Sequence, residues 1–252
     1  MDTSNTSPKK AEILSVPFDV LTCDEALALL SGFLQSAQNH LVVTPNPECV
    51  MVARRDPAYL HILQTADLVF ADGTGILLAS RWLRKSLPER VRGVDMTLQL
   101  LDTVRGTDKT VYLLGAAAGV AEKAAQKLAE SGVTVAGARD GFFEEGAAKE
   151  AEILAELNRI KPNILIVGMG MPRQEKWAFA HKDKLPCKVM LCVGGTIDVL
   201  AGNAKLAPAW LRAIGLEWLY RLLMQPSRAK RMLALPRFAL LVLRQRRQKL
   251  NK

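Results

Sequence analysis

An aspartate at the end of a β-rich run is the strongest candidate for chemistry in this sequence. In LVFADGTG, Asp72 follows apolar residues typical of a buried strand, and Gly73 and Gly75 let the backbone approach a ligand closely. The helix expected from Ile76 would point its first amide groups at the same space. A carboxylate there can act as a general base. The alternative is that Asp72 or Thr74 only caps the helix, since both residue types are preferred caps.

A second strand end offers neutral hydrogen-bonding groups. In TPNPE, Thr44 closes an apolar run, Asn46 is suited to cap a helix, and Pro47 suits the first helical turn. Capping alone would explain Asn46. A threonine hydroxyl and an asparagine amide at such an edge are also groups that recognise a sugar or a base. Both interpretations stay open at this point.

Arginines are the candidates for binding phosphate. Arg90 and Arg92 in LPERVRG would neutralise a diphosphate, although arginines in exposed loops are usually only solvated. Gln174 and Glu175 in MPRQEKW follow a strand and a turn, which fits either a pocket or a helix start. The histidines are scattered, and the sequence has neither a D-x-D motif nor a G-x-S-x-G elbow. We therefore expect no metal cofactor and assign any phosphate binding to arginines.

The glycine spacing argues against a dinucleotide site. YLLGAAAG at 112–119 and VGMGMP at 167–172 follow β-rich runs, but neither contains G-x-G-x-x-G. A nicotinamide-dependent Rossmann enzyme is thus an alternative with little support.

The elements that must position these residues form an α/β pattern. At the N-terminus we expect a flexible tail over 1–12 and an extended pair over 13–22 around Pro17. A helix capped by Asp24 should follow and run to about Ser36. Six β-rich runs then alternate with helical patterns, at 41–46, 68–73, 110–116, 133–138, 163–170 and 188–195. Such alternation predicts a Rossmann-like fold, with a mostly parallel sheet flanked by helices. Ligands of such sheets bind beyond the carboxyl ends of the strands.

Length and composition indicate one main domain. A chain of 252 residues that is 49% hydrophobic and 23% charged can bury a single α/β core, which we place at 13–203. Its four cysteines form no C-x-x-C pair and lie in or beside apolar runs, as in a reducing cytosol. No run approaches a membrane span, and the first residues lack the apolar segment of a signal peptide. We expect a cytoplasmic protein and leave its oligomeric state open, a homo-oligomer included.

The positive charge is concentrated after residue 203. Residues 204–252 contain 12 lysines or arginines and one acidic residue, Glu217, which gives +11, so residues 1–203 carry −2 of the total +9. We expect helices around 208–224 and, after a break at Pro226, in a basic and apolar segment interrupted by Pro236. As a helix lying in a lipid interface, this appendage would bind an anionic membrane through a set of basic and apolar residues. That set is Arg237, Phe238, Leu241 and Arg244.

Two other interpretations of this segment remain open. It would also suit a helix packed on the body with a solvated basic end. A basic tail attracts any polyanion, so a nucleic-acid-binding α/β protein is a further alternative. The tail lacks a recognisable reading motif, and its arginines alternate with Leu, Phe and Val rather than with base-stacking aromatic residues. We therefore expect no nucleic-acid partner.

Eight motifs follow one another along the chain: TPNPE, ADGTG, LPERVRGVD, YLLGAAAG, GFF at 141–143, VGMGMPRQEKW, CVGGTIDVLAG and AP-x-W…GLEWLYRL…P-x-R-x-x-R. Together and in this order, from about Ile13 to Pro236, they resemble the WecG/TagA/CpsF family, glycosyltransferase family 26. The resemblance implies a metal-independent, inverting, membrane-associated enzyme on the inner face of the cell membrane. It implies an N-acetylmannosamine-type sugar on a UDP donor and an undecaprenyl-diphosphate-linked N-acetylglucosamine acceptor, in cell-surface polysaccharide or teichoic-acid-type biosynthesis.

The resemblance also assigns roles to individual residues. Asp72 matches the proposed catalytic base. The matching pocket positions are Thr44, Asn46, Arg90 and Gln174, and Arg221, Arg228 and Arg231 match arginines of a C-terminal appendage that closes over the donor. Two departures, Ile197 where an aromatic residue is common and Ala71 where some sequences have Pro, bear on the choice of donor sugar.

Overall fold

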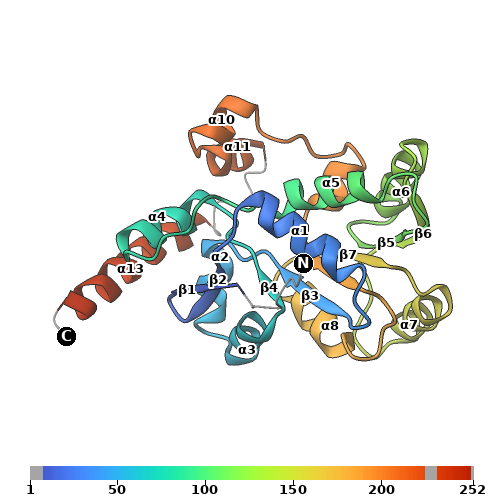
Figure 1. The fold of residues 1–252 in the computed structure, drawn as a ribbon, viewed down its shortest axis with the longest axis horizontal. Helices are drawn as coiled ribbons and strands as arrows, with labels where there is room; N and C mark the ends of the chain where they lie inside the picture. Colours follow the sequence, from blue (N-terminus) through green and yellow to red (C-terminus); the bar gives the residue numbers. More distant parts are fainter. Residues whose placement is uncertain (1–7, 225–231, 251–252) are drawn as a thin grey trace, which may run out of the picture.

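A six-stranded parallel sheet forms the centre of the computed structural model, which describes residues 8–224 and 232–250 (Figure 1). Its strands are β3 (His40–Val43), β4 (Leu68–Val69), β5 (Thr110–Gly115), β6 (Thr134–Arg139), β7 (Ile164–Gly168) and β8 (Val189–Cys192). They lie in the order β4-β3-β8-β7-β5-β6, and every pairing described is parallel. All six carboxyl ends therefore share one edge, and the fold predicted from the sequence is confirmed.

Helices cover both faces of the sheet, which is why its inner strands are apolar throughout. Every residue of β7 and β8 is buried. One face packs against α1 (Cys23–Phe33), α5 (Gly93–Val104), α6 (Val120–Glu130) and α9 (Thr196–Leu200). The core cluster of the other face includes residues of α2 (Pro47–Ala53), α3 (Pro57–Thr65), α4 (Thr74–Trp82), α7 (Ala148–Ile160) and α8 (Arg173–His181). Side chains alternate between the two clusters along β3, as a pleated strand requires.

The N-terminal extended pair is a hairpin that begins earlier than expected. Strand β1 (Lys10–Ile13) pairs antiparallel with β2 (Val16–Asp19), so the predicted flexible tail is wrong from Lys10 onward. The turn lies at Leu14 and Ser15 rather than around Pro17, and both turn residues have positive φ, of 50° and 71°. Two such residues give a turn whose twist matches that of a hairpin.

The first helix is capped by Thr22, not by Asp24. The Thr22 hydroxyl accepts from the Glu25 amide, and the Glu25 carboxylate accepts from the Thr22 amide at 2.8 Å. This reciprocal capping box satisfies two amide groups at once, which a cap at Asp24 would not do. The helix ends at Phe33, before the predicted Ser36.

The C-terminal region contains three described helices. Instead of one helix over 208–224, there are α10 (Ala209–Ala213) and α11 (Glu217–Met224), separated at Gly215, which has a φ of 77°. The predicted break at Pro226 lies outside the described residues. Helix α13 (Ala234–Leu250) is not interrupted by Pro236, because that residue lies in its first turn, where no amide donor is needed.

Helix α13 is packed on the body. It lies along α4 in Figure 1 and contacts both α2 and α4. Phe238 and Val242 are 4% and 0% exposed, and the Gln245 Oε1 accepts from the Leu14 amide at 3.3 Å. The described helices include none that is long and apolar enough to cross a membrane.

Candidate active site

Thr44 lies where the ends of β3 and β8 meet. Its hydroxyl donates to the Cys192 carbonyl at 3.1 Å, which ties the two strand ends together. A Cβ atom placed on Gly93 would lie only 2.9 Å from the Thr44 methyl group, so the start of α5 closes on the same residue. Thr44 is therefore held half-buried at the carboxyl edge of the sheet.

Asn46 caps helix α2 and touches the loop that carries Asp72. Its Oδ1 accepts from the Cys49 amide at 3.1 Å, and Pro47 occupies the first turn, so the predicted capping role is confirmed. A Cβ atom on Gly75 would lie 2.7 Å from the Pro47 ring. The absence of a side chain at Gly75 thus lets the loops after β3 and β4 pack directly against each other.

Asp72 follows β4 and does not cap α4. The N-cap of that helix is Gly73, with a φ of 92°, and no described side chain accepts a hydrogen bond there. The Asp72 amide donates to the Phe70 carbonyl at 3.0 Å, and the residue is half-buried. The capping interpretation is thus not what the structure shows. Asp72 directly precedes Gly73, where an added Cβ atom would lie 3.7 Å from the Asn46 Cβ, so the loop of Asp72 packs against the start of α2.

Arg90 is held against this loop by Thr74 and Glu217. Its Nη1 donates to the Thr74 hydroxyl at 3.2 Å, and its Nη2 lies 3.6 Å from a Glu217 carboxylate oxygen. The Thr74 hydroxyl in turn donates to the Gly215 carbonyl at 3.4 Å. The start of α11 is thereby joined to the first turn of α4, directly after Asp72.

Arg92 is a buried member of the same cluster. It is 4% exposed, with Nη2 2.9 Å from Glu217 and Nη1 2.8 Å from Asp95. Arg212 also approaches Asp95, at 3.8 Å. Three arginines thus share the carboxylates of Asp95 and Glu217 in this cluster.

Gln174 lies in the first turn of α8, in contact with the turn after β8, and is 4% exposed. Its Oε1 accepts from the amides of Gly170 at 3.2 Å and Gly194 at 3.0 Å, and its Nε2 donates to Glu175 at 2.8 Å. The predicted pocket residue is thus engaged with the turns after β7 and β8.

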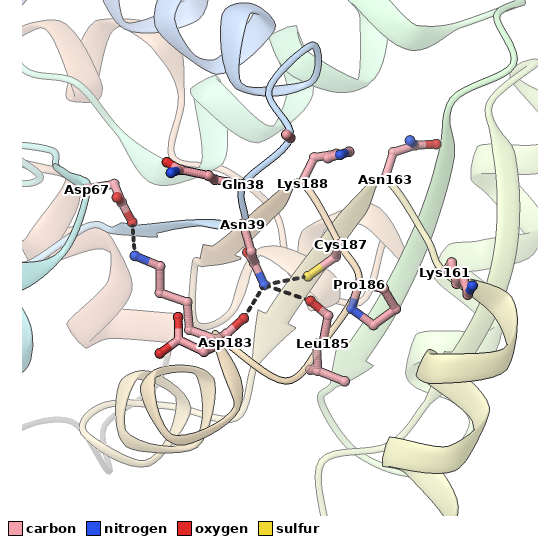
Figure 2. Close-up of a pocket in the computed structure, with 12 residues that line it drawn as sticks. Gln38, Asn39, Asp67, Lys161, Asn163, Asp183, Leu185, Pro186, Cys187 and Lys188 are labelled. Carbon is pink, nitrogen blue, oxygen red and sulfur yellow. Dashed lines mark hydrogen bonds and ion pairs between the residues drawn. The ribbon is translucent and has the colours of Figure 1, made fainter.

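A cavity of about 760 Å³ lies at the opposite edge of the sheet, where the strands begin. Figure 2 shows Asn39, Asn163 and Lys188 around it, each just before a strand. Asn39 donates to the carbonyls of Lys182 and Leu185 at 2.8 and 3.2 Å, which braces one wall. None of the predicted site residues lines this cavity. Ligands of parallel sheets bind at the other edge, so we place the site there.

The structure therefore brings Thr44, Asn46, Asp72 and Arg90 to one place. Arg221 lies on α11, one turn beyond Glu217, but its side chain is outside the described residues, as are Arg228 and Arg231. The described ranges contain no group of three His, Cys, Asp or Glu residues that could hold a metal ion.

The predicted membrane residues are divided between the two faces of α13. Arg237 and Arg244 are exposed, whereas Leu241 is partly buried and Phe238 packs against the core. In this arrangement Phe238 cannot meet lipid. Exposed apolar side chains on the same helix and just before it are Leu233, Leu240 and Leu243.

Sequence reasoning missed Thr74 and Glu217 as members of the site. Glu217 carries a signal in hindsight, because it is the one acidic residue after 203 and stands among apolar residues in GLEWLYRL. An isolated acid in a basic, apolar segment requires a cationic partner when it is buried.

Comparison with known proteins shows the family of this chain. Residues 11–252 match the model of the "Glycosyl transferase WecG/TagA/CpsF family". The chain is 33% identical to the N-acetylglucosaminyldiphosphoundecaprenol N-acetyl-beta-D-mannosaminyltransferase of Staphylococcus aureus strain MRSA252, over 93% of this chain and 92% of that one. Identity to the protein of the same name from strain MW2 is also 33%, with the same coverage.

Proposed function

Because this chain belongs to the WecG/TagA/CpsF family of glycosyl transferases, we propose that it moves an N-acetylmannosamine-type sugar from UDP to undecaprenyl-diphosphate-linked N-acetylglucosamine. The observation that carries the proposal is 33% identity across nearly the whole of two relatives whose names state this acceptor and sugar. The site supports it, since neutral hydrogen-bonding groups and an arginine lie at the carboxyl edge of the sheet, in or against the loops after β3 and β4, and Asp72 is part of the loop after β4.

In the proposed reaction, Asp72 acts as general base. It takes the proton from an acceptor hydroxyl, whose oxygen then attacks the anomeric carbon while the bond from that carbon to the UDP oxygen breaks. Attack opposite to the leaving group inverts the anomeric centre, which gives the β-linked product named for the relatives from an α-linked donor. UDP departs with an extra negative charge.

Arginines stabilise that charge in the proposal, in place of a metal ion. Arg90 is the candidate nearest to Asp72 along the contacts described, since it binds Thr74 of the same loop. Arg221 lies on α11, one helical turn beyond Glu217, and is the second candidate for binding the diphosphate. Guanidinium groups suit this role because they bind phosphate oxygens in pairs and remain charged at all working pH values.

The lipid-linked acceptor places the reaction at the inner face of the cell membrane in this proposal. The exposed face of α13 and the residue before it present Leu233, Arg237, Leu240, Arg244 and Arg247. Leucines among arginines suit a helix in contact with an anionic lipid surface. Residues of the docked face, Phe238 and Val242, would stay in the core.

A transfer assay with the full chain tests the function. We expect UDP-N-acetylmannosamine and a short-chain lipid diphosphate carrying N-acetylglucosamine to give product equally with EDTA and with Mg²⁺. A requirement for a divalent ion would overturn metal independence alone, and transfer from a different UDP-sugar would change only the donor. If no sugar reaches the lipid diphosphate, or if calorimetry shows binding of NAD but not of UDP, the proposed function is wrong.

A further inference from the structure

Glu175 is a buried carboxyl group for which the proposed reaction has no use. It lies in the first turn of α8 and is 3% exposed. Its Oε1 accepts from the Gln174 amide group at 2.8 Å, whereas Oε2 has no hydrogen-bond partner in the described part of the chain. Burial raises the pKa of this carboxyl group to about 7. A buried acid kept without an ion-pair partner is costly, so its position calls for a reason.

The orientation of the Gln174 amide depends on this carboxyl group. Two backbone N–H groups, from Gly170 and Gly194, point at one end of the amide, so that end must be the oxygen. The NH₂ end then faces Glu175, which accepts its hydrogen bond. A glutamine amide has only one acceptor end, and a flipped amide would set donors against donors.

The two turns that Gln174 contacts each contain a glycine in a conformation that other residues rarely adopt. Gly170 and Gly194 have φ values of 81° and 53°, which favour glycine. A Cβ atom on Gly168 would lie 2.6 Å from the Gly194 carbonyl oxygen, so the two turns come very close together. The Thr44 hydroxyl donates to the Cys192 carbonyl at the same end of β8.

We propose that Glu175 is a positioning residue of the transferase site, which fixes the Gln174 amide and, through it, the turns after β7 and β8. Its relevance to turnover rests on the proposed function. In this arrangement the Gln174 amide oxygen is taken up by the two glycine amides, and one N–H of its NH₂ group is taken up by Glu175. Glu175 acts through a hydrogen-bond acceptor, which both its ionised and its neutral form provide.

The groups that face Glu175 come from three elements. They are Cys49 of α2, Tyr59 of α3 and Cys192 of β8, and burial raises the pKa of each. All three are neutral at ordinary pH. No cation in the described residues therefore competes with Gln174 for the carboxyl oxygen.

Two replacements at Glu175 test the need for an acceptor. Glu175→Gln retains a carbonyl oxygen toward Gln174, so we expect kcat and KM within a factor of about three of the original values. Glu175→Leu removes the acceptor, and we expect a loss in kcat of roughly 10²-fold, the scale reported for small misplacement of reacting groups. Equal activity of the two variants would overturn the proposal.

Exchanging the two side chains gives a sharper test. Gln174→Glu alone places two carboxyl groups side by side and should lose activity. In the double variant Gln174→Glu with Glu175→Gln, the carboxylate accepts from both glycine amides and from the new glutamine, so we expect recovery to within about threefold of the original kcat. A double variant no better than Gln174→Glu would contradict the proposal.

Hydrogen exchange measures the same effect without any substrate. We expect the Gly170 and Gly194 amides to exchange at least about tenfold faster in Glu175→Leu, and to regain protection in the exchanged pair. Glu150→Leu is the control, because Glu150 is also buried but contacts Gly146, Trp177 and His181 rather than Gln174. Unchanged exchange in Glu175→Leu would overturn the positioning role of Glu175, even if the protein transfers the sugar as proposed. Faster exchange would support that role even if the proposed transfer is wrong.

Discussion

At Asp72, an amide in place of the carboxylate should separate catalysis from folding. Gly73 is the N-cap of α4, so Asp72→Asn removes no capping interaction. We expect kcat to fall by roughly 10²-fold, the usual scale for loss of a general base, with UDP affinity and thermal stability nearly unchanged. Single-turnover kinetics would place the loss in the chemical step. Turnover within a factor of about two of the original would exclude Asp72 as the base.

Glu175 should also give the stability of the protein a distinct pH dependence. Its folded pKa of about 7 lies above the ordinary value of 4.5, so the folded state holds this proton more tightly than the unfolded state. Its contribution is therefore fully present below about pH 4.5 and is lost as pH rises to about 7, by up to about 3 kcal/mol.

Chemical unfolding of the original protein and Glu175→Gln at about pH 5 and about pH 8 tests this sign. The variant cannot ionise at this position, so its advantage over the original should grow with pH. A constant difference between the two proteins would show that Glu175 does not titrate in this range.

At the scale of elements, the buried pair of Arg92 and Glu217 joins α11 to the rest of the site. The two side chains are 4% and 10% exposed and 2.9 Å apart. In Arg92→Met the Glu217 carboxylate keeps Arg90, and in Glu217→Met the Arg92 guanidinium keeps Asp95, so each buried charge loses one of its two partners. We expect either variant to lower the free energy of unfolding by about 1–3 kcal/mol. The double replacement should recover much of that loss, because no buried charge of this pair remains.

Turnover should not recover together with stability in that double variant. Glu217 also holds Arg90, so its loss should leave Arg90 misplaced and kcat low. The exposed pair of Arg105 and Asp102 is the control, and Asp102→Asn should cost less than about 1 kcal/mol. If the double variant loses as much free energy of unfolding as the two single variants combined, the Arg92–Glu217 pair does not join these elements.

The elements were predictable from the sequence wherever a local pattern determined them. Six apolar runs marked the six strands, and Asn46 before Pro47 marked a helix start. The cap of α1 was misplaced because Thr22 and Asp24 are both good caps, and the reciprocal bond with Glu25 decides between them. The interruption at Gly215 depends on its contact with Thr74, which is distant in sequence.

The site was predictable in its location but not in its internal contacts. Parallel strands bring Thr44 and Asp72 to one edge by topology alone. Whether an amide such as Gln174 faces a ligand or the protein depends on three-dimensional neighbours, here Gly170 and Gly194. The burial of Arg92 likewise depends on Glu217, which is far along the chain.

At the scale of the whole molecule, the two faces of α13 should have separable roles. Phe238 is 4% exposed, whereas Leu240, two residues later, is 52% exposed. We expect Phe238→Ala to lower the free energy of unfolding by about 3–5 kcal/mol, as for other buried aromatic residues. Leu240→Ala should leave stability nearly unchanged but weaken binding to anionic vesicles several-fold.

Vesicle sedimentation and chemical unfolding of both variants check this division. If Leu240→Ala binds vesicles as the original does, the exposed face of α13 is not the lipid contact. If Phe238→Ala is as stable as the original, the docked helix contributes little to the core. The sequence could not separate these roles, because Phe, Leu and Val occur all around this helix and its partners lie on α2 and α4.

The docking of α13 also bears on the order of events during synthesis. The β1–β2 hairpin, which contains Leu14, is synthesised early, and α13, which contains Val242, is synthesised last. Both contribute to the same core cluster, and Gln245 of α13 accepts a hydrogen bond from the Leu14 amide. The ribosome must therefore produce the entire sheet before the surface beside that hairpin can be covered. Until then, apolar residues of α2 and α4 stay open to chaperones or to other nascent chains. A ribosome that stalls between the end of the sheet and α13 would leave a partly folded, aggregation-prone chain rather than a smaller working enzyme.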